Sequence, residues 1–586
     1  MAKRLGNHTV VIVGGGLTAG LIARQLTAKG IDVLVLERGA DHGAAAESHF
    51  PNQRDELRWD TRQGIIQDWS LQTYSLRHDT KEDALPVRWM EAFLPGEGLG
   101  GAGSHWNGIT WRWSEYDPAM RSHLEARYGK KSIPANMPLQ DWGVTYTELE
   151  PYHHLFEKLF GVAGKAGNIK GEIKEGGNPF EAPRRDDYPQ APLEITEAGL
   201  IFQEAARKKG YKPFPMPGAN STGAYTNPDG QTLGRCQYCG HCDRFVCDAH
   251  AKGTPDQLLY PMLATRKGFE LRLRCHVLDV LYDRKARRVT GVRYVDLVTG
   301  EEIEQPADAV VLAGFTMTNT KLLLVGGIGK AYDPKTDTGV VGKNFCYQTT
   351  SSVSLFFKDR WINPFFNSGS TATTIDEFNN DNFDHTGLGF FGGAVISAAV
   401  FSGRPIGARR VPPGTPRWGT KWKQANADWY AHAFALSAWG SCYPNRENYL
   451  DLDPEYKDAY GQPLVRMTFD WRENELKMSE YVTKKMEELA KVSGATLVGP
   501  ANPRKGPFDT RVYQTTHITG GTVMGRDPKT SVVSPHLQHW DAENLFVVGA
   551  STYPHDSGYN PTGPLGALAL RLGDDLVQYT QRPRML

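Results

Sequence analysis

Hydrophobic positions near the start of the chain fall into two short runs with a helical stretch between them. Residues 8–13 (HTVVIV) and 31–36 (IDVLVL) are apolar and largely β-branched, which predicts two buried parallel strands. Residues 21–29 between them carry apolar side chains at helical spacing. Strand, helix and strand in this order predict an α/β domain with a Rossmann-like sheet.

Further along the chain the pattern favours additional strands and one long helix. Residues 270–280 and 288–295 are predicted to pair across a turn, and 307–313 to form a buried strand of the first sheet. Between 351 and 469, strand patterns separated by Pro- and Gly-rich loops predict a mixed or antiparallel sheet. The apolar stripe along 472–492 predicts a core helix. The expected fold class is therefore α/β, or α+β overall.

A glycine turn joins the first strand to its helix, and the second strand ends at an acid. Gly14 permits a tight turn, Gly16 lets a pyrophosphate approach the backbone, and the small Ala19 allows close helix packing. The helix N-terminus then offers amide groups to the phosphates. Glu37 stands where its carboxylate can accept hydrogen bonds from a ribose. This pattern predicts a dinucleotide site and fits FAD and NAD equally.

Composition narrows the classes of function. The 586 residues contain 66 Lys plus Arg and 66 Asp plus Glu, so net charge indicates neither a nucleic acid nor an acidic lipid as partner. No apolar run approaches the about 20 residues of a membrane-spanning helix. The start of the chain lacks the features of a signal peptide, so the chain is expected to carry no export signal of its own.

Four of the seven cysteines are clustered with the spacing C-x2-C-x2-C-x4-C, which predicts a metal centre. The predicted ligands are Cys236, Cys239, Cys242 and Cys247. Successive thiols at this interval favour an iron–sulfur cluster. Zinc is the alternative, although zinc sites usually pair two short elements across a longer spacer.

Three further motifs point to a family. They are PGEGLGGAGSHWNG at 95–108, TTHITGGTVMG at 515–525 and GASTYPHDSGYNPTG at 549–563. Together with VVIVGGGLTAG at 10–20, their order resembles that of the glucose–methanol–choline (GMC) oxidoreductases. Within that family the chain is most similar to the flavoprotein subunits of gluconate 2-dehydrogenases and related sugar dehydrogenases. The resemblance covers nearly the whole chain and implies FAD as the cofactor.

The resemblance also assigns residues to the cofactor. Those implied to surround FAD, besides the first glycine turn and Glu37, are Gly100, Gly103, Ser104, His105, Trp106, Asn107, Val277, Gly549, Ala550, Pro561 and Thr562. His105 lies in a Ser-His-Trp segment similar to one at which some relatives bind FAD covalently, so a covalent link is expected there, with simple packing as the alternative. Val277 is implied to meet the adenine through its backbone.

His517 and Asn560 match the catalytic pair of the family. A histidine can hold an alcohol oxygen and take its proton near neutral pH, while hydride leaves the carbon for flavin N5. The Asn560 amide can hold the same oxygen without titrating. His555 is a second candidate for the base, because it stands five residues before Asn560.

The resemblance also suggests how the chain is divided. A discontinuous FAD-binding domain is expected from residues 1–135, 190–345 and 508–586, with the cysteines inside it. Residues 346–507 are expected to form the substrate-binding domain, and 136–189 a connecting or lid segment.

The predicted function is oxidation of a secondary alcohol on a sugar or sugar acid, with electrons leaving through the cluster to a cytochrome or quinone. The alternatives are a glucoside 3-dehydrogenase acting on neutral glycosides and an oxidase that forms hydrogen peroxide. A different class is a structural or electron-carrying flavoprotein that has no substrate. Such a protein is expected to lack the His–Asn pair, and both residues are present here. Arg112 is a candidate for binding an anionic substrate.

Further expectations come from the relatives alone. Related dehydrogenases carry a three-iron cluster (3Fe-4S), although a four-iron cluster (4Fe-4S) would use all four cysteines. The relatives also imply a small export-bearing subunit and a cytochrome c subunit as partners. A periplasmic location by export with a partner is therefore expected, with the cytoplasm as the alternative.

Overall fold

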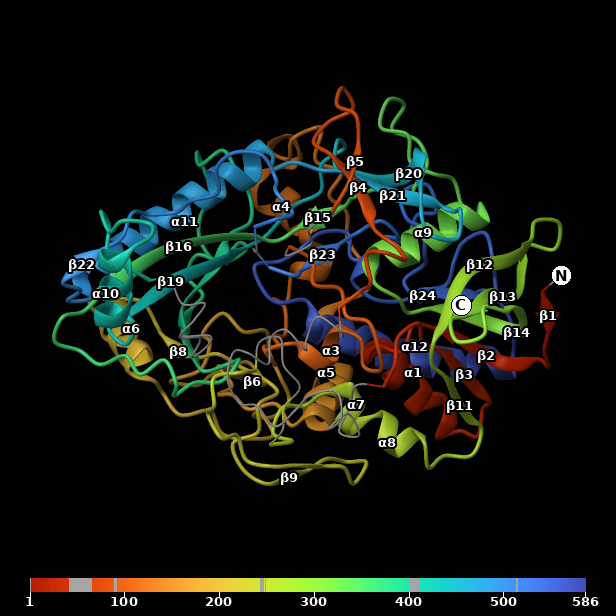
Figure 1. Cartoon of the computed structure of the whole chain (residues 1–586), viewed down its shortest axis with the longest axis horizontal. Helices are drawn as coiled ribbons and strands as arrows, with labels where there is room; N and C mark the ends of the chain where they lie inside the picture. The colour runs from red at the N-terminus through yellow and green to blue at the C-terminus, as the bar shows by residue number, and fades with distance from the viewer. Residues whose placement is uncertain are drawn as a thin grey trace.

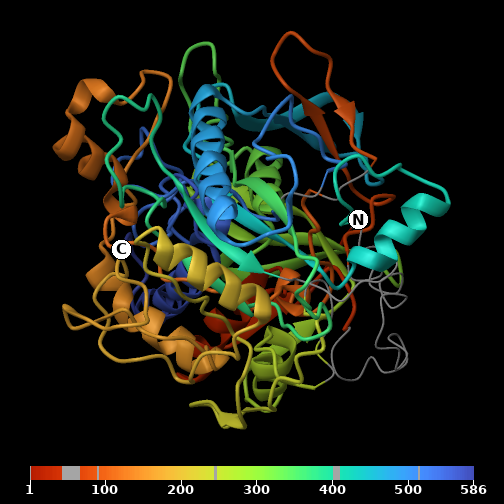
Figure 2. The same ribbon diagram turned by 90° about the vertical axis from the view of Figure 1, so that its left-hand side faces the viewer.

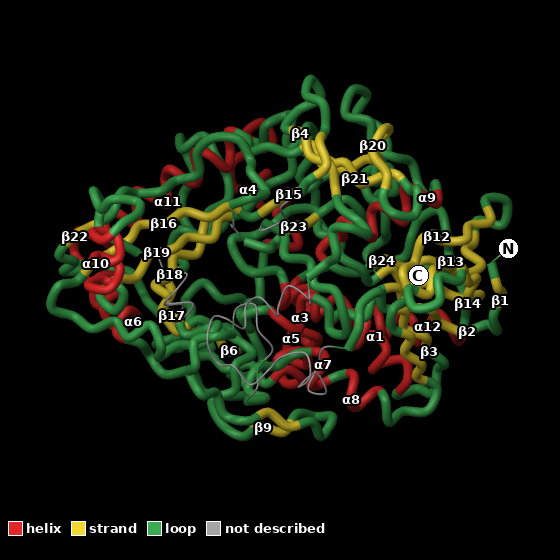
Figure 3. Tube along the Cα trace, viewed as in Figure 1, coloured by secondary structure: helices red, strands yellow, loops and turns green. Residues whose placement is uncertain are grey.

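A computed structural model describes residues 2–41, 66–88, 92–242, 247, 249–399, 410–512 and 515–586 (Figure 1). The sheet containing β2, β3 and β14 lies at one side of the molecule, and the sheet containing β16 and β19 lies at the other. Helix α3 and strands β15 and β23 lie between them (Figures 1 and 3). Within the described part of the chain, no helix combines the length and apolar character that a bilayer crossing requires.

The first sheet has the Rossmann-like arrangement that the sequence predicts. Its strands run in the order β11-β3-β2-β14-β13-β12, with β1 and β24 also paired to β14. The bounds are β1 Lys3–Arg4, β2 His8–Val13, β3 Val33–Leu36, β11 Phe269–Arg272, β12 Cys275–Asp283, β13 Arg288–Asp296, β14 Glu302–Leu312 and β24 Leu545–Val547. Strands β11, β3, β2, β14 and β24 are parallel, whereas β13 and β12 add on antiparallel.

The predicted strand 270–280 is wrong as a single element. The chain forms β11 and β12 instead, broken at Arg274, whose positive φ of 58° turns the backbone. The Arg274 N–H donates to the Gly39 carbonyl at 3.1 Å. The first part therefore pairs in parallel with β3, and only the second part pairs with β13.

Three helices pack together beneath the first sheet. They are α1 (Leu17–Thr27), α5 (Tyr146–Phe160) and α12 (Thr562–Gln581), and α12 packs against both of the others. Glycine allows the close approach, because a Cβ at Gly566 would lie 2.3 Å from the Phe156 ring. The capping box of Thr145 and Glu148 begins α5 by satisfying its first amides.

The second sheet is antiparallel, and two helices cover one of its faces. Its order is β22-β16-β19-β18-β17-β8. The bounds are β8 Phe214–Pro215, β16 Thr349–Phe356, β17 Ala372–Ile375, β18 Ala394–Ala399, β19 Ala433–Gly440 and β22 Leu497–Val498. Helices α6 (Glu197–Lys208) and α11 (Glu473–Val492) share one apolar core with these strands (Figure 2). Helix α11 confirms the core helix predicted at 472–492.

A third sheet joins distant parts of the chain. Strand β4 (Tyr74–Arg77) runs parallel to β21 (Pro463–Thr468), with β5 and β20 at the outside. The remaining described elements are β5 Leu85–Pro86, β6 Asn168–Ile169, β7 Glu172–Ile173, β9 Tyr225–Thr226, β10 Thr232–Leu233, β15 Cys346–Tyr347, β20 Tyr449–Lys457, β23 Ile518–Thr519, α3 Ala102–His105, α4 Met120–Tyr128, α7 Pro255–Leu258, α8 Tyr260–Leu263, α9 Thr316–Gly326, α10 Thr420–Trp429 and the 3-10 turns Asp117–Ala119, Lys130–Ser132 and Ala550–Thr552.

We predict that Gly566→Ala destabilises the protein. Alanine favours a helix over glycine by about 1 kcal/mol, but the added methyl group would overlap the buried Phe156 ring. Overpacking of this kind costs about 1–3 kcal/mol. Urea unfolding followed by circular dichroism should show a lower midpoint. In a Phe156→Leu background the same change should have little effect, and an equal loss in both backgrounds would contradict the packing argument.

Candidate active site

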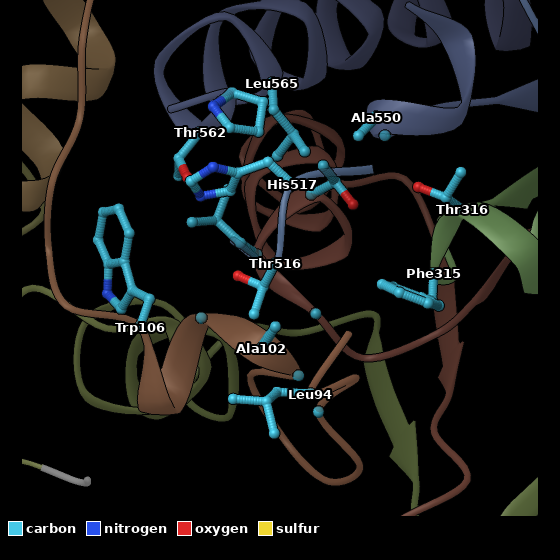
Figure 4. A pocket seen from close by; sticks show the side chains of 18 of the residues that line it. Leu94, Ala102, Trp106, Phe315, Thr316, Thr516, His517, Ala550, Thr562 and Leu565 are labelled. Carbon is cyan, nitrogen blue, oxygen red and sulfur yellow. The ribbon is translucent and has the colours of Figure 1, made fainter. Parts of the chain in front are cut away.

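A cavity of about 380 Å³ lies at the carboxyl ends of three parallel strands, β2, β14 and β24 (Figure 4). The segments that follow these strands, 14–18, 313–316 and 549–550, all contribute to its wall. The lining includes the following residues predicted from the motifs: Gly14, Gly16, Glu37, Gly100, Gly103, His105, Trp106, Asn107, His517, Gly549, Ala550, Asn560, Pro561 and Thr562. The motifs, far apart in sequence, therefore meet at one site.

The two glycine-rich segments are in contact at the N-terminus of helix α1. The Gly100 N–H donates to the Gly15 carbonyl at 2.8 Å, and a Cβ at Gly101 would lie 3.3 Å from the Gly16 Cα. Gly14 has a φ of 99°, and its Cβ would meet the Ala313 carbonyl at 3.0 Å. By contrast, a Cβ at Gly16 would meet nothing within 4 Å, because Gly16 borders the open cavity.

Glu37 ties the first glycine turn to the second glycine-rich segment. Its buried carboxylate accepts hydrogen bonds from the amides of Gly15 at 2.6 Å, Gly39 at 2.8 Å and Gly98 at 3.1 Å. Burial raises the pKa of Glu37, and these amides counteract part of that effect. A carboxylate offers about four acceptor positions, so the cavity-lining Glu37 retains capacity for a ribose hydroxyl.

The segment after the second glycine cluster divides between cavity and core. His105, Trp106 and Asn107 line the cavity. Ser104 lies outside the lining, and its hydroxyl oxygen lies 2.9 Å from the Leu99 carbonyl and 3.0 Å from Asp256 Oδ1. Ser104 therefore anchors the short helix α3 rather than facing the cavity.

Val277 lies on β12, outside the cavity lining. The same strand does reach the nucleotide-binding motif, because the Cys275 N–H donates to the Glu37 carbonyl at 2.8 Å. The structure does not bring Val277 to the cavity wall with the other predicted residues, and its backbone contact with an adenine stays a prediction.

His517 and Asn560 meet at the cavity wall. The Asn560 Nδ2 lies 3.3 Å from the His517 Nε2. On the other side of the ring, His517 Nδ1 lies 2.7 Å from Gln348 Oε1. Burial lowers the pKa of His517 to about 4, so the imidazole is neutral near pH 7. A neutral imidazole beside an amide can hold an alcohol and accept its proton.

The four clustered cysteines lie on a loop away from the cavity. Cys236 and Cys242 are buried, Cys247 is half-buried and Cys239 is exposed. Residues 243–246 and 248 lie outside the described residues. Among the residues that the structure does describe, no group of three or more His, Cys, Asp or Glu side chains is arranged to hold a metal ion.

The surroundings of these cysteines nevertheless suit ligated sulfur. The Tyr238 N–H points at the Cys236 Sγ at 3.4 Å, the Ala251 N–H at the Cys247 Sγ at 3.4 Å, and the Asn220 amide at the Cys242 Sγ at 3.5 Å. Hydrogen bonds to sulfur are among the features that tune an iron–sulfur centre. The buried ammonium of Lys252 links the loop to the cavity wall, donating to the carbonyls of Cys242 at 3.0 Å and Trp106 at 2.6 Å.

Comparison with known proteins decides the family. Residues 183–350 and 444–569 match the family described as GMC oxidoreductase, and residues 12–73 match an NAD(P)-binding Rossmann-like domain. The gluconate 2-dehydrogenase flavoprotein of Pantoea cypripedii is 44% identical over 576 residues, covering 97% of this chain and 93% of that protein. The chain belongs to the GMC oxidoreductases.

Other GMC relatives match over the full length. The fructose dehydrogenase large subunit of Gluconobacter japonicus is 25% identical, covering 98% of this chain and 99% of that protein. A solved structure of formate oxidase from Aspergillus oryzae superposes with a TM-score of 0.60 at 16% identity, covering 100% of both chains, which concerns the fold alone. As a GMC oxidoreductase, this chain is an FAD-dependent enzyme that oxidises alcohols. The predicted family, fold class and flavin cofactor are confirmed.

The cavity fits FAD. Helices α1 and α12 both begin at its wall, so two sets of free backbone amides face the space. Gly16 leaves room for a pyrophosphate where any side chain would intrude. Glu37 lines this cavity with acceptor capacity to spare, and His517 and Asn560 line the same cavity. The FAD-binding role of each residue stays a prediction of the family motifs.

The expectation that Arg112 binds an anionic substrate is wrong. Arg112 is buried outside the cavity lining and forms a two-pronged ion pair with Glu157, at 2.8 and 2.9 Å. It also pairs with Glu150 at 3.0 Å. Burial alone would raise the pKa of Glu157, but the charges of Arg112 and Arg184 hold it at about 2. Among the described residues of the lining there is no Lys or Arg.

His555 also lies away from the cavity. It is fully buried among Trp113, Trp142 and Tyr443, and its Nε2 is 3.6 Å from Asp117 Oδ1. Because His555 is absent from the cavity lining, His517 is the only one of the two candidate bases that reaches it.

Sequence reasoning missed two partners of the catalytic pair. Gln348 follows β15 in the stretch FCYQTT, where no motif marks it. Trp111 stands among other tryptophans, yet its indole N–H donates to Asn560 Oδ1 at 3.1 Å. Nothing in the spacing of these residues predicts the contacts. Gln348 meets His517 beside the pair β15–β23, whereas Trp111 and Asn560 meet from segments outside the strands.

We predict that Gly16→Val yields protein with little flavin. The valine side chain would fill the open space in front of α1, where the backbone must approach the pyrophosphate. The ratio of flavin to protein absorbance after purification measures the effect. Gly6→Val is the matched control, because a Cβ at Gly6 also meets nothing within 4 Å but lies away from the cavity. Normal flavin content in Gly16→Val would contradict this account of the site.

Proposed function

We propose that the chain is an FAD-dependent dehydrogenase that oxidises a secondary alcohol of a sugar acid, in the manner of a gluconate 2-dehydrogenase. The observation that carries the proposal is the approach of His517 Nε2 and Asn560 Nδ2, at 3.3 Å, on the cavity wall. The full-length similarity to the Pantoea cypripedii flavoprotein supports a sugar acid as the substrate.

Asn560 and His517 have different roles at the hydroxyl group of the substrate. Asn560 donates an N–H to the hydroxyl oxygen and holds it beside the imidazole. His517 accepts the hydroxyl proton at Nε2 as negative charge builds on the oxygen. FAD, when bound, supplies the acceptor for the hydride that leaves the carbon. The low pKa of His517 keeps its ring ready to take a proton throughout the neutral range.

We propose that Cys236, Cys239, Cys242 and Cys247 hold an iron–sulfur cluster. Their spacing and the N–H groups directed at three of the sulfurs support it. Three iron atoms are favoured over four on the likeness to related dehydrogenases. When bound, a cluster would supply one-electron transfer to a cytochrome or quinone.

Partners and location are part of the same proposal. The relative from Gluconobacter japonicus is named a large subunit, which supports assembly with other subunits. We propose a small export-bearing subunit and a cytochrome c subunit, with the enzyme at work in the periplasm. The covalent attachment of FAD to His105 is likewise proposed, because His105 lines the cavity.

A neutral sugar is the second candidate substrate. The described lining contains no cationic side chain to pair with a carboxylate, which favours recognition by hydroxyl groups. The similarity to a fructose dehydrogenase large subunit supports the same alternative. Reduction of the flavin under anaerobic conditions by gluconate, fructose or a glucoside separates these candidates.

We predict that His517→Asn lowers kcat/KM by about 10²–10⁴-fold, because the base is removed. In the natural enzyme, kcat/KM should stay level from pH 8 downward and fall only as pH approaches 4, where His517 takes up a proton. Stopped-flow reduction of the flavin across this pH range measures both effects. His555→Asn should keep most of the activity. A fall in kcat/KM centred near the ordinary histidine value of about 6.5 would contradict the assignment.

We predict that the purified chain contains iron and acid-labile sulfide. Cys236→Ser and Cys242→Ser should lose both and the paramagnetic signal, whereas flavin content should be retained. Cys275→Ser is the matched control, because Cys275 is equally buried but lies on β12. Zinc in place of iron, or full iron content in the serine variants, would contradict the proposal. Testing all four cysteines shows whether one is dispensable, as a three-iron cluster requires.

A further inference from the structure

A chain of hydrogen bonds runs through the catalytic pair and ends in backbone carbonyls. Gln348 is fully buried, and its side-chain amide donates to the carbonyls of Ser557 at 2.9 Å and Tyr559 at 3.1 Å. A carbonyl can only accept, so the Gln348 NH₂ group must face these two atoms. The Gln348 Oε1 therefore faces His517 Nδ1, at 2.7 Å, and must accept a hydrogen bond from it.

The opposite end of this series of hydrogen bonds is a group that can only donate a hydrogen bond. The indole N–H of Trp111 points at Asn560 Oδ1 at 3.1 Å. This contact turns the Asn560 NH₂ group toward His517 Nε2, at 3.3 Å. Because one end only donates and the other only accepts, the four side chains have a single hydrogen-bond direction that satisfies every contact.

From this geometry we infer that Gln348 and Trp111 are positioning residues that fix His517 as the tautomer protonated at Nδ1, with an unprotonated Nε2 that meets the Asn560 amide at the cavity wall. The inference rests on the proposed function, since it gives His517 the role of base. Neither Gln348 nor Trp111 lines the cavity, so both act through the residues that do. The opposite tautomer would set two lone pairs against each other at Gln348 and two N–H groups against each other at Asn560.

The surroundings make this direction hard to reverse. Gln348 is held by its backbone as well, because its N–H donates to the His517 carbonyl at 3.1 Å and its carbonyl accepts from the Thr515 hydroxyl at 3.3 Å. The Trp111 ring is stacked on Tyr559 with centroids 5.0 Å apart. In such a buried setting, a misdirected amide leaves donors and acceptors without partners.

Substitutions at Gln348 separate positioning from simple packing. In Gln348→Met the acceptor is lost, the tautomer is no longer fixed, and kcat should fall by about 10²-fold or more, as when a catalytic histidine loses its orienting partner. In Gln348→Glu the carboxylate still accepts from Nδ1 but stabilises the charged ring. The fall of kcat/KM at acid pH should then move upward by about 1–3 pH units.

Two further variants complete the set. Trp111→Phe keeps an aromatic ring against Tyr559 but removes the N–H that directs Asn560, so kcat should fall by about tenfold. Gln538→Met is the matched control, because Gln538 is also fully buried and also donates to two backbone carbonyls, of Glu543 and Arg584. It lies outside the cavity lining, and its loss should leave the pH profile unchanged.

The tautomer of His517 can be measured directly, without an activity assay. Long-range ¹H–¹⁵N spectra of enzyme with ¹⁵N-labelled histidine, assigned with His517→Asn, should show Nδ1 protonated and Nε2 bare, and Gln348→Met should show a mixture. Protonated Nε2 in the natural enzyme, or equal losses in Gln348→Met and Gln348→Glu without a pH shift, would overturn the inference. If no sugar or sugar acid reduces the flavin while the spectra show the expected tautomer, only the proposed substrate fails.

Discussion

The site depends on one constraint: three parallel strands must end at the same edge and turn away from each other without their backbones colliding. Glycine at positions 14, 314 and 549 makes room for these turns. The buried Asn319 joins two of them, accepting from the Gly314 N–H at 2.9 Å and donating to the Val548 carbonyl at 3.0 Å. The cavity is the space left where these strands diverge, so its floor is made of backbone amides. Glu37 enters the cavity from the end of β3, whereas His517 and Asn560 enter from segments outside the parallel strands.

A buried cluster of ion pairs holds the segment that contains Trp111 in place. Arg112, Arg184 and Glu157 form a buried ion-pair cluster that anchors the loop of Trp111 to helix α5. Breaking such a cluster by removing one partner is expected to cost about 3–5 kcal/mol, because a buried charge is left behind. The arginine that the sequence offers for an anionic substrate is therefore committed to structure. The described lining therefore offers no Lys or Arg side chain to a carboxylate.

The sequence predicts those parts of the fold that depend on local patterns of apolar positions and turn residues. The strand–glycine–helix unit, the antiparallel second sheet and the core helix α11 follow from periodicity and turn residues, and the motifs bring His517 and Asn560 to one cavity. The break at Arg274 could not be predicted, because it depends on a backbone contact with Gly39 far away in sequence. The same holds for Gln348, whose partners come from the strand pair β15–β23 and from the segment 557–559. Local patterns cannot specify which amide faces which carbonyl across a fold.

Among the residues that the structure describes, the buried Lys252 connects the cysteine loop to the cavity wall. Lys252 is fully buried and bonds to the carbonyls of Cys242 and Trp106, and Trp106 lines the cavity. Burial raises the pKa of Cys242, and the charge of Lys252 pulls it back toward the thiolate. The charge of Lys252 therefore acts on the loop of the clustered cysteines from the side that faces the cavity.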